Sequence, residues 1–505
     1  MRLVTIFVCL MALISGASHT TAETLEIRFQ NQLNSMGYNV GQEDGILGRK
    51  TIAAYREALK NNGISFDGKV DEDDFKILEK IYSSKSKLRV NKIEDCKYLT
   101  KSGISRSKLA VQYRGDKLNY PSAAIQTTFG TDHLYTLVFP HEARSKPEYT
   151  EGFAITSCGN QTKFLGTLGV DLNAARDAKE IKLSNGSTGV VIVETGGEFP
   201  RKKHDIWEHG KVWIAKLKDD IITVEILENR LAFFHSVTTG DFNDDGLEDI
   251  IVQYFNSRDK ILKNNGFLLF LQQDKAGNFK RVKPLIHNST FGSAVLLTNL
   301  DDDPELELVQ AGYKKPIPPF KGSFKIYDRS NGIFKKKVEF KRESLSTQGA
   351  GVSKISEIDF DNDGDNDLLL QVEANKKGLL LYENLGNFKF SLRTEFFADL
   401  PSDTAIYQWR EAVIADVNDD GFEDVVLNGW GGKEWWENNI GAAVFINKQG
   451  KMFERQMNNR KLNQQERSAY YFRYSKFEEM NSFMFFGTSG IIKQVSIPES
   501  VFNDD

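Results

Sequence analysis

A short acidic segment that recurs at a nearly constant interval constrains the fold of this chain more than any other feature. Its most regular copy is DFDNDGDND at residues 359–367. Carboxylates at positions 1, 3, 5 and 9, with a glycine at position 6, can bring several oxygens to one hard cation such as Ca²⁺. Related segments begin at residues 241, 299 and 416, so the four starting points are 58, 60 and 57 residues apart. Such regular spacing indicates a structural repeat.

The segment at 359–367 begins like the loop of an EF-hand but does not end like one. An EF-hand loop carries a bidentate Glu at position 12 and lies between two helices. Here position 12 is Leu370, and the apolar residues on both sides have the composition of strands. We therefore expect calcium loops that lie within β-hairpins.

The chain beyond residue 95 has the pattern of a β protein. Short runs of Val, Ile, Leu, Phe and Tyr alternate with Gly, Asn and Asp turns. Each acidic segment leads into an apolar strand and is followed by a hairpin, so each unit has room for four strands, the size of one β-propeller blade. Extending the interval outward predicts copies without carboxylates near Ala124, Ile181 and Ser475. We predict a mainly β fold, a seven-bladed β-propeller over residues 96–505.

The N-terminal end has the features of a secretory signal peptide. Arg2 precedes an apolar run, residues 3–14, and small residues follow up to Ala22. This run is too short to span a bilayer as a helix. We expect residues 1–22 to be removed after Ala22, or after Ala17, and the protein to be periplasmic or extracellular. No later segment predicts a transmembrane anchor.

Two cysteines, Cys96 and Cys158, would remain in the exported chain. An oxidising compartment permits a disulfide between them, but a sequence gives no separation of their Cα atoms. Pairing and buried free thiols therefore both stay open.

Residues 23–82 have a helical rather than a β pattern. Leu25, Phe29 and Leu33 recur at helical spacing, and a third helix is expected to run to Tyr82 with Asp71 as its N-cap. We predict a small three-helix domain here. Residues 83–95, rich in Ser and Lys, are expected to form a linker.

Two turns in this segment carry a resemblance to a known family. They are DGILG at 44–48, which follows Gly37 and Tyr38, and FDGKV at 66–70. With them, residues 23–82 resemble the bacterial peptidoglycan-binding domain of cell-wall hydrolases and other envelope proteins. The resemblance implies non-covalent attachment to murein without catalysis in the domain; a spacer that has lost glycan affinity is the alternative. The candidate contacts are Tyr38, Leu47, Arg49 and Thr51.

The acidic segments and their register resemble the FG-GAP or VCBS repeats of integrin α-chain propellers and of bacterial exported proteins. The resemblance implies that a loop binds Ca²⁺ through the side chains at positions 1, 3, 5 and 9 and the backbone carbonyl at position 7. In the three regular loops, the implied ligands are Asp241, Asn243, Asp245, Leu247 and Asp249; Asp359, Asp361, Asp363, Asp365 and Asp367; and Asp416, Asn418, Asp420, Phe422 and Asp424.

The segment at 299–307 departs from this pattern. Pro304 stands where the other loops have glycine, and proline cannot adopt a left-handed conformation because its ring fixes φ near about −65°. Position 9 is Glu307 instead of Asp. We expect weaker or altered binding, and whether this loop holds a metal stays open. Its candidate ligands are Asn299, Asp301, Asp303 and Glu307.

Charge and motifs narrow the function. The formal net charge of −5 does not favour nucleic acid or anionic lipid as a partner. The sequence contains no H-E-x-x-H or G-x-S-x-G motif and no Cys-His arrangement suited to transpeptidation. Carboxylate pairs that could cleave a glycan stay open, because their separations in space are unknown.

Aromatic residues close to the fourth acidic segment are candidate ligand contacts. Trp430, Trp435 and Trp436 could stack on sugar rings, or they could pack within a blade. We expect a calcium-stabilised, non-catalytic scaffold that is tethered to peptidoglycan and presents its propeller to a glycan or protein ligand. The alternatives are a carbohydrate-active enzyme, a lyase or hydrolase with the propeller as catalytic body, and a surface adhesin.

Overall fold

The computed structural model describes most of residues 24–503. The described residues are 24–36, 38, 40, 44–85, 87–89, 105–110, 121–131, 133–140, 151–158, 161–172, 175–195, 210–229, 232–257, 267–283, 285–286, 292–301, 303–313, 322–330, 332–340, 352–372, 378–393, 406–432, 438–455, 471–477, 480–486 and 491–503. The expected signal peptide, Cys96, Trp435 and Trp436 lie outside them.

Three helices form the N-terminal domain, as the sequence predicts: α1 (Leu25–Ser35), α2 (Arg49–Asn61) and α3 (Glu72–Lys85). Asp71 caps α3, because its Oδ1 accepts a hydrogen bond from the backbone N–H of Asp73 at 2.9 Å. The helices enclose a small apolar core that includes the fully buried side chains of Leu33, Tyr55 and Leu78. None of the helices in the described ranges is long and apolar enough to cross a membrane.

The described strands beyond the helices form seven antiparallel sheets. In chain order, the first sheet contains β3 (Pro121–Thr127), β4 (Leu134–Pro140), β5 (Glu151–Cys158) and β6 (Gln161–Asp171), and the second contains β7 (Ala175–Lys182), β8 (Thr188–Glu194), β9 (Val212–Lys218) and β10 (Ile221–Glu228), with β1 (Lys87–Arg89) added to β10. The third contains β11 (Ala232–Gly240), β12 (Asp249–Ser257), β13 (Leu268–Gln273) and β14 (Phe279–Val282), and the fourth contains β15 (Gly292–Thr298), β16 (Glu307–Tyr313), β17 (Gly322–Ser330) and β18 (Ile333–Phe340). The fifth contains β19 (Val352–Ile358), β20 (Asp367–Val372), β21 (Leu379–Asn384) and β22 (Phe390–Arg393), and the sixth contains β23 (Ile406–Ala415), β24 (Asp424–Gly432), β25 (Asn438–Asn447) and β26 (Phe453–Arg455).

The remaining sheet joins the two ends of the β region. It contains β27 (Tyr471–Phe477), β28 (Met480–Phe486) and β29 (Ile491–Pro498), and β29 pairs with the early strand β2 (Ser105–Ala110). The register runs from Ser105 opposite Ser496 to Ala110 opposite Ile491. A short helix, α7 (Ser500–Asn503), follows β29.

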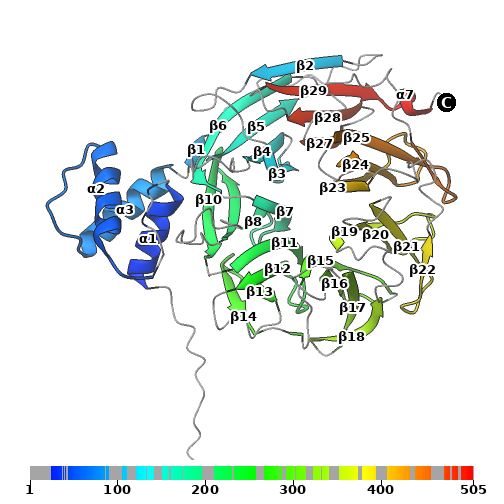
Figure 1. Ribbon diagram of the computed structural model, residues 1–505, viewed down its shortest axis with the longest axis horizontal. Coiled ribbons are helices and arrows are strands. Elements are labelled where there is room, and N and C mark those ends of the chain that lie inside the picture. Colours follow the sequence, from blue (N-terminus) through cyan, green and yellow to red (C-terminus); the bar gives the residue numbers. More distant parts are fainter. Residues whose placement is uncertain are drawn as a thin grey trace, which may run out of the picture.

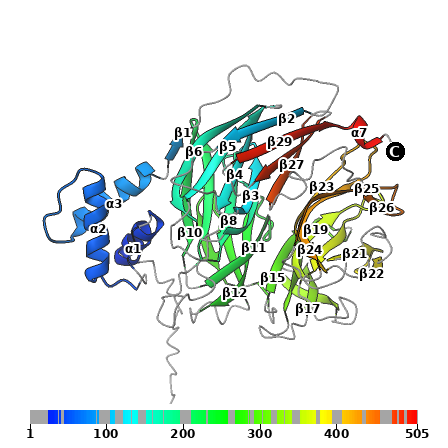
Figure 2. The ribbon, with the colours of Figure 1, turned by 45° about the horizontal axis from the view of Figure 1, so that its top comes forward.

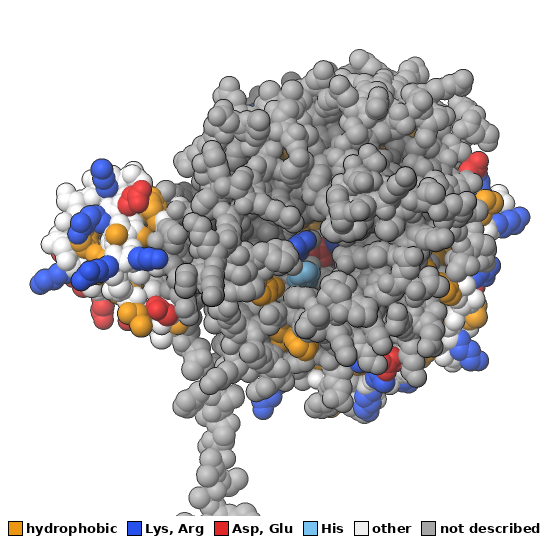
Figure 3. Space-filling model, in the orientation of Figure 1, with side chains coloured by type: hydrophobic (Ala, Val, Ile, Leu, Met, Phe, Trp, Pro, Cys, Tyr) orange, Lys and Arg blue, Asp and Glu red, His pale blue; other side chains and the backbone are white. Residues whose placement is uncertain are grey.

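The sheets stand side by side around a common centre, so the fold is a β-propeller (Figure 1). The innermost strands are β3, β7, β11, β15, β19, β23 and β27, and the other strands of each sheet lie towards the rim. Charged side chains and a histidine gather in the hollow at the centre of one face (Figure 3). The three helices project from the side of the ring next to β1, β6 and β10 (Figures 1 and 2).

Apolar side chains of neighbouring sheets form the core between them. The second strands are buried on both faces, as the run from Asp367 to Val372 in β20 illustrates. One cluster, for example, combines Ile251 of β12 with Leu297 of β15 and Leu308 of β16. Burial between sheets explains why these strands read as continuous apolar runs in the sequence.

The segment expected to be a linker is partly structured. Within residues 83–95, residues 83–85 belong to α3 and residues 87–89 form β1. β1 pairs with β10 from Lys87 opposite Thr223 to Arg89 opposite Ile221. The carboxylate-free loops also begin slightly later than expected: β3 and β7 end at Thr127 and Lys182.

Candidate metal centres

All four acidic segments occupy the same place in their sheets, where each connects the first strand to the second. Residues 241–249 join β11 to β12, residues 299–307 join β15 to β16, residues 359–367 join β19 to β20, and residues 416–424 join β23 to β24. The four loops therefore lie on the same face of the ring, and each loop contacts the next sheet.

The three regular loops share one backbone conformation. Position 4 is left-handed in each, with φ of 62° at Asp244, 60° at Asn362 and 61° at Asp419. The glycine at position 6 also has a positive φ, for example 92° at Gly364. A positive φ is costly for residues with a Cβ, so this turn explains the glycine. Pro304 excludes the same turn from the loop at 299–307.

The carboxylate at position 1 organises each regular loop. Asp359 accepts the backbone N–H of Asp363 at Oδ1 and that of Gly364 at Oδ2, both at 3.1 Å. Asp241 and Asp416 accept the equivalent pairs of N–H groups. These hydrogen bonds alone hold the backbone of each loop around the carboxylate at position 1.

The carboxylate at position 9 is buried at the start of the second strand. Asp367 accepts backbone N–H groups from Phe360 at 2.9 Å and from Asn384, on the third strand, at 2.6 Å. Asp424 makes the equivalent pair of bonds, and Asp249 accepts the N–H of Gln273 at 2.8 Å. Burial raises the pKa of Asp249, Asp367 and Asp424 to about 7, and nearby carboxylates of the same loops add to the rise. A cation would favour their charged forms.

The loop at 359–367 brings its carboxylates closest together. Asp359, Asp361 and Asp363 each offer an oxygen, and these oxygens lie within 4.8 Å of one another. Burial raises the pKa of Asp361, and it raises that of Asp365 to about 6. One oxygen of Asp365, Oδ1, is buried without a hydrogen-bond partner among the described residues. This donor set suits a divalent cation that prefers oxygen ligands.

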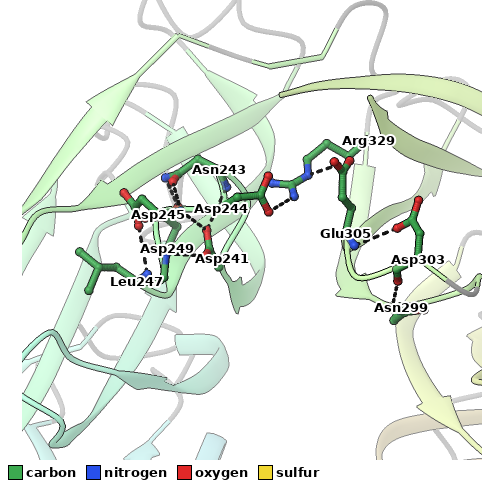
Figure 4. Close-up of polar contacts among 11 residues, drawn as sticks. Asp241, Asn243, Asp244, Asp245, Leu247, Asp249, Asn299, Asp303, Glu305 and Arg329 are labelled. Carbon is green, nitrogen blue, oxygen red and sulfur yellow. Dashed lines mark hydrogen bonds and ion pairs between the residues drawn. The ribbon is translucent and has the colours of Figure 1, made fainter. Parts of the chain in front are cut away.

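The other two regular loops have an amide at position 3. Asn243 donates through Nδ2 to Asp249 at 2.7 Å, and Asn418 donates to Asp420 at 3.0 Å. Figure 4 shows Asn243 with Asp241, Asp245 and Asp249 around the loop. The implied carbonyl ligands, Leu247 and Phe422, follow directly after Gly246 and Gly421.

The loop at 299–307 gathers a different set of carboxylates. Asp301 and Glu307 approach Asp328 of β17, and their oxygens lie within 4.8 Å of one another. Asn299 donates to the backbone carbonyl of Asp303 at 2.6 Å (Figure 4). Sequence reasoning missed Asp328, because it lies outside the acidic segment and only the pairing of β17 with β16 places it beside the loop.

The candidate contacts of the helical domain are divided between its core and its surface. Tyr38 and Thr51 are buried, Leu47 packs partly against the core, and Arg49 is exposed. The Tyr38 hydroxyl accepts a hydrogen bond from Asn61 at 3.2 Å. Of the four residues, Arg49 is therefore the best placed to meet a ligand.

An open pocket of about 590 Å³ lies at the end of α2, beside the second DG turn. It is lined by Arg56, Lys60 and the segment from Gly63 to Gly68. The Arg56 guanidinium lies 5.1 Å from the centre of the Phe66 ring. Sequence reasoning placed the contacts at the first DG turn and missed this pocket, which forms only where α2 meets residues distant from that turn.

Of the three tryptophans proposed as ligand contacts of the propeller, the structure describes the position of one. Trp430 lies on β24, opposite Gln408 of β23. Trp435 and Trp436 fall outside the described ranges.

Comparison with protein-family models agrees with the geometry of both parts of the chain. Residues 359–427 match the model described as "FG-GAP-like repeat", and residues 27–78 match that of "Putative peptidoglycan binding domain". The chain combines a propeller that contains an FG-GAP-like repeat with an N-terminal domain of the peptidoglycan-binding type. A search of curated proteins found no match.

The solved structures that resemble this chain are distant. Sqt1 of Saccharomyces cerevisiae is 11% identical, with a TM-score of 0.44 over 78% of this chain and 100% of its own. Sqt1 of Chaetomium thermophilum, bound to the N-terminus of ribosomal protein L10, is 9% identical, with a TM-score of 0.40 over 72% and 80%. The Aleuria aurantia lectin, in complex with a fucosylated sugar, is 10% identical, with a TM-score of 0.35 over 64% and 91%. Scores this low carry no weight for function.

Proposed function

We propose that this chain is an exported, calcium-stabilised binding module that attaches to peptidoglycan through its helical domain and presents the propeller to a glycan or protein ligand. The observation that carries the proposal is the combination of two parts: a peptidoglycan-binding-type domain at residues 27–78 and a ring in which four sheets have an acidic loop between their first and second strands. Export through residues 1–22 would deliver both to the cell envelope.

Calcium has a structural role in this proposal. Each of the seven sheets would be one blade, and Ca²⁺ would fill the three glycine-bearing loops. The metal would be held by the carboxylates at positions 1, 3, 5 and 9, with Asn243 and Asn418 turning their amide oxygens inward. The buried position-9 carboxylate links each loop to the third strand of its sheet. Calcium binding would therefore contribute to the free energy of unfolding.

Attachment to murein would use the pocket beside the second DG turn together with Arg49. Arg56 and Lys60 give the pocket a basic wall, and Phe66 gives it an apolar surface. Carboxylates of murein stem peptides complement such a wall, and the faces of sugar rings complement an aromatic side chain.

Co-sedimentation of the full mature chain with purified sacculi tests the proposal. The unaltered chain should sediment with sacculi, and Arg56→Ala combined with Lys60→Ala should reduce the bound fraction about tenfold or more. Lys80→Ala on α3, an exposed basic residue outside the pocket, is the matched control. A chain that stays in the supernatant would overturn peptidoglycan attachment. Release of new reducing or unsaturated ends from sacculi would favour a carbohydrate-active enzyme.

A further inference from the structure

We propose that the loop at 299–307 binds a divalent cation through a ligand set of its own, in which Asp328 of β17 joins Asp301 and Glu307. The inference rests on the proposed calcium dependence of the propeller and adds a site that the regular pattern of ligands does not contain. Its essential feature is a ligand from the third strand of the sheet.

Strand register places Asp328 beside the loop. Leu308, the residue after Glu307, pairs with Tyr327, so Asp328 lies at the level where the loop enters β16. The same count in the other three sheets gives Gln272, Glu383 and Ile446. The residue type at this position therefore differs from sheet to sheet, and only some sheets can offer a carboxylate there.

The three carboxylates converge on one point. Asp301, Glu307 and Asp328 each have an oxygen within 4.8 Å of the others, and Glu307 and Asp328 are buried. Three negative charges this close repel one another strongly in a partly buried site. A divalent cation among them would remove the repulsion.

The carboxylate of Glu307 provides a second, independent observation that points to a bound cation. Its side chain has no exposed surface. One oxygen, Oε2, accepts the backbone N–H of Leu300 at 2.6 Å, whereas the other, Oε1, is buried without a hydrogen-bond partner among the described residues. A buried carboxylate oxygen that no donor satisfies is costly, and a metal ion satisfies it directly.

The change of ligand set follows from the sequence of the loop. Pro304 removes the left-handed turn that positions the ligands of the regular loops. Glu307 is one methylene longer than the Asp found at position 9 elsewhere, so its carboxylate reaches further from the strand. Asp328 then provides a carboxylate from outside the loop.

Two basic side chains, Lys337 and Arg329, lie near the cluster. Lys337 lies with Nζ 2.7 Å from Oδ2 of Asp328, but its side chain is 46% exposed and can move into solvent. Arg329 is fully buried and pairs with Asp244 of the preceding loop and with Glu305 (Figure 4). Lys337 is therefore the group that an incoming cation would displace.

The number of calcium ions bound per chain tests the proposal, measured by calorimetric titration and by elemental analysis of the dialysed protein. Asp328→Asn should bind one ion fewer than the unaltered chain, or bind it about tenfold or more weakly. Asp363→Asn is the matched variant in a regular loop, and it should also lose one ion. The double variant should lose two.

The outcomes separate this inference from the proposed function. If Asp328→Asn keeps every ion at unchanged affinity while Asp363→Asn loses one, the ligand set proposed here is wrong and the calcium-stabilised propeller stands. If the unaltered chain binds no calcium, the calcium dependence itself fails.

A second variant covers the case in which Asp328→Asn does not fold. Lys337→Gln removes the competing ammonium, so calcium should bind more tightly at one site. If Asp328 serves only its ion pair with Lys337, then Lys337→Gln should instead leave calcium affinity unchanged and lower stability in EDTA as much as Asp328→Asn does.

Discussion

Lys354 reaches across the centre of the ring to Asp177, with its Nζ 2.9 Å from Oδ1 of the carboxylate. Lys354 lies on β19 and Asp177 on β7, and the sheets that begin with β11 and β15 stand between them along the chain. Asp177 also accepts hydrogen bonds from the Ser236 hydroxyl at 3.0 Å and from the backbone N–H of Val237 at 3.1 Å. Burial opposes ionisation of Asp177, but the positive charges of Lys354 and Lys179 and the hydrogen bond from Val237 hold its pKa below the ordinary value. The pair thus connects non-adjacent parts of the ring.

Removing Lys354 should destabilise the propeller. Lys354→Met leaves the Asp177 carboxylate buried without its cation, which costs about 3–5 kcal/mol in comparable buried pairs. Urea unfolding followed by fluorescence would measure the loss. The control is Lys216→Met, which breaks the ion pair with Glu225 at the surface and should cost about 1 kcal/mol or less. Equal losses in the two variants would contradict a special role for the central pair.

Stability without calcium should fall as the pH rises. The pKa of Asp249, Asp367 and Asp424 is raised from 3.8 to about 7 by burial. A carboxyl whose pKa is higher in the folded state stabilises the fold fully below its unfolded pKa, and this contribution is lost as the pH rises through the folded pKa. In EDTA, the melting temperature should therefore decrease from pH 5 to pH 8.

Excess calcium should remove or reverse this trend, because the metal binds the ionised carboxylates. Asp177 does not disturb the test, since its pKa is lowered and its contribution changes only under more acidic conditions. Thermal melts in both buffers would measure the effect. A melting temperature in EDTA that increases towards pH 8 would contradict the burial of these groups.

Neutralising one ligand of the most acidic loop should matter only when calcium is present. Asp363→Asn removes one of the three converging carboxylates and should lower the melting temperature in calcium by several degrees, but leave it nearly unchanged in EDTA. Asp219→Asn, in the turn between β9 and β10, is a control that should behave alike in both buffers. Equal losses for Asp363→Asn in the two buffers would argue against a metal in this loop.

Buried amides that join neighbouring sheets should contribute to stability independently of the metal. Asn447 donates to the carbonyl of Phe360, in the preceding loop, at 2.7 Å and to that of Glu423 at 3.1 Å. Asn384 and Asn481 make the equivalent bonds to Leu300 and Val417. Asn447→Leu should remove the hydrogen bonds to both carbonyls and cost about 1–3 kcal/mol, measured by urea unfolding. A neutral effect would show that water replaces the amide.

The sequence predicted those features that depend on local pattern. The acidic loops, the apolar strands that follow them and the three helices each have a spacing that is visible within a few residues. The geometry shared by the three regular loops depends on the glycine at position 6 and the Asp at position 1. These local patterns, together with the nearly constant interval between the acidic segments, were sufficient to predict a propeller and the places where a metal could bind.

The features that the sequence did not predict depend on contacts between distant segments. Asp328 and Lys354 reach their partners only through strand register and ring closure. Tyr38 and Thr51 looked available because they flank a turn, but the packing of α1 against α2 buries them. The pairing of β2 with β29 had no repeat pattern to reveal it, since β2 is separated from its own sheet by almost the whole ring.

That pairing has a mechanical consequence. From the helical domain, the chain passes first through β1, paired with β10, then through β2, paired with β29, and only then enters β3. A pull applied to the helices would load the three residue pairs between β1 and β10 before it reached the seam that closes the ring. The short strand β1 would therefore separate from β10 before any force reached the sheet that closes the ring.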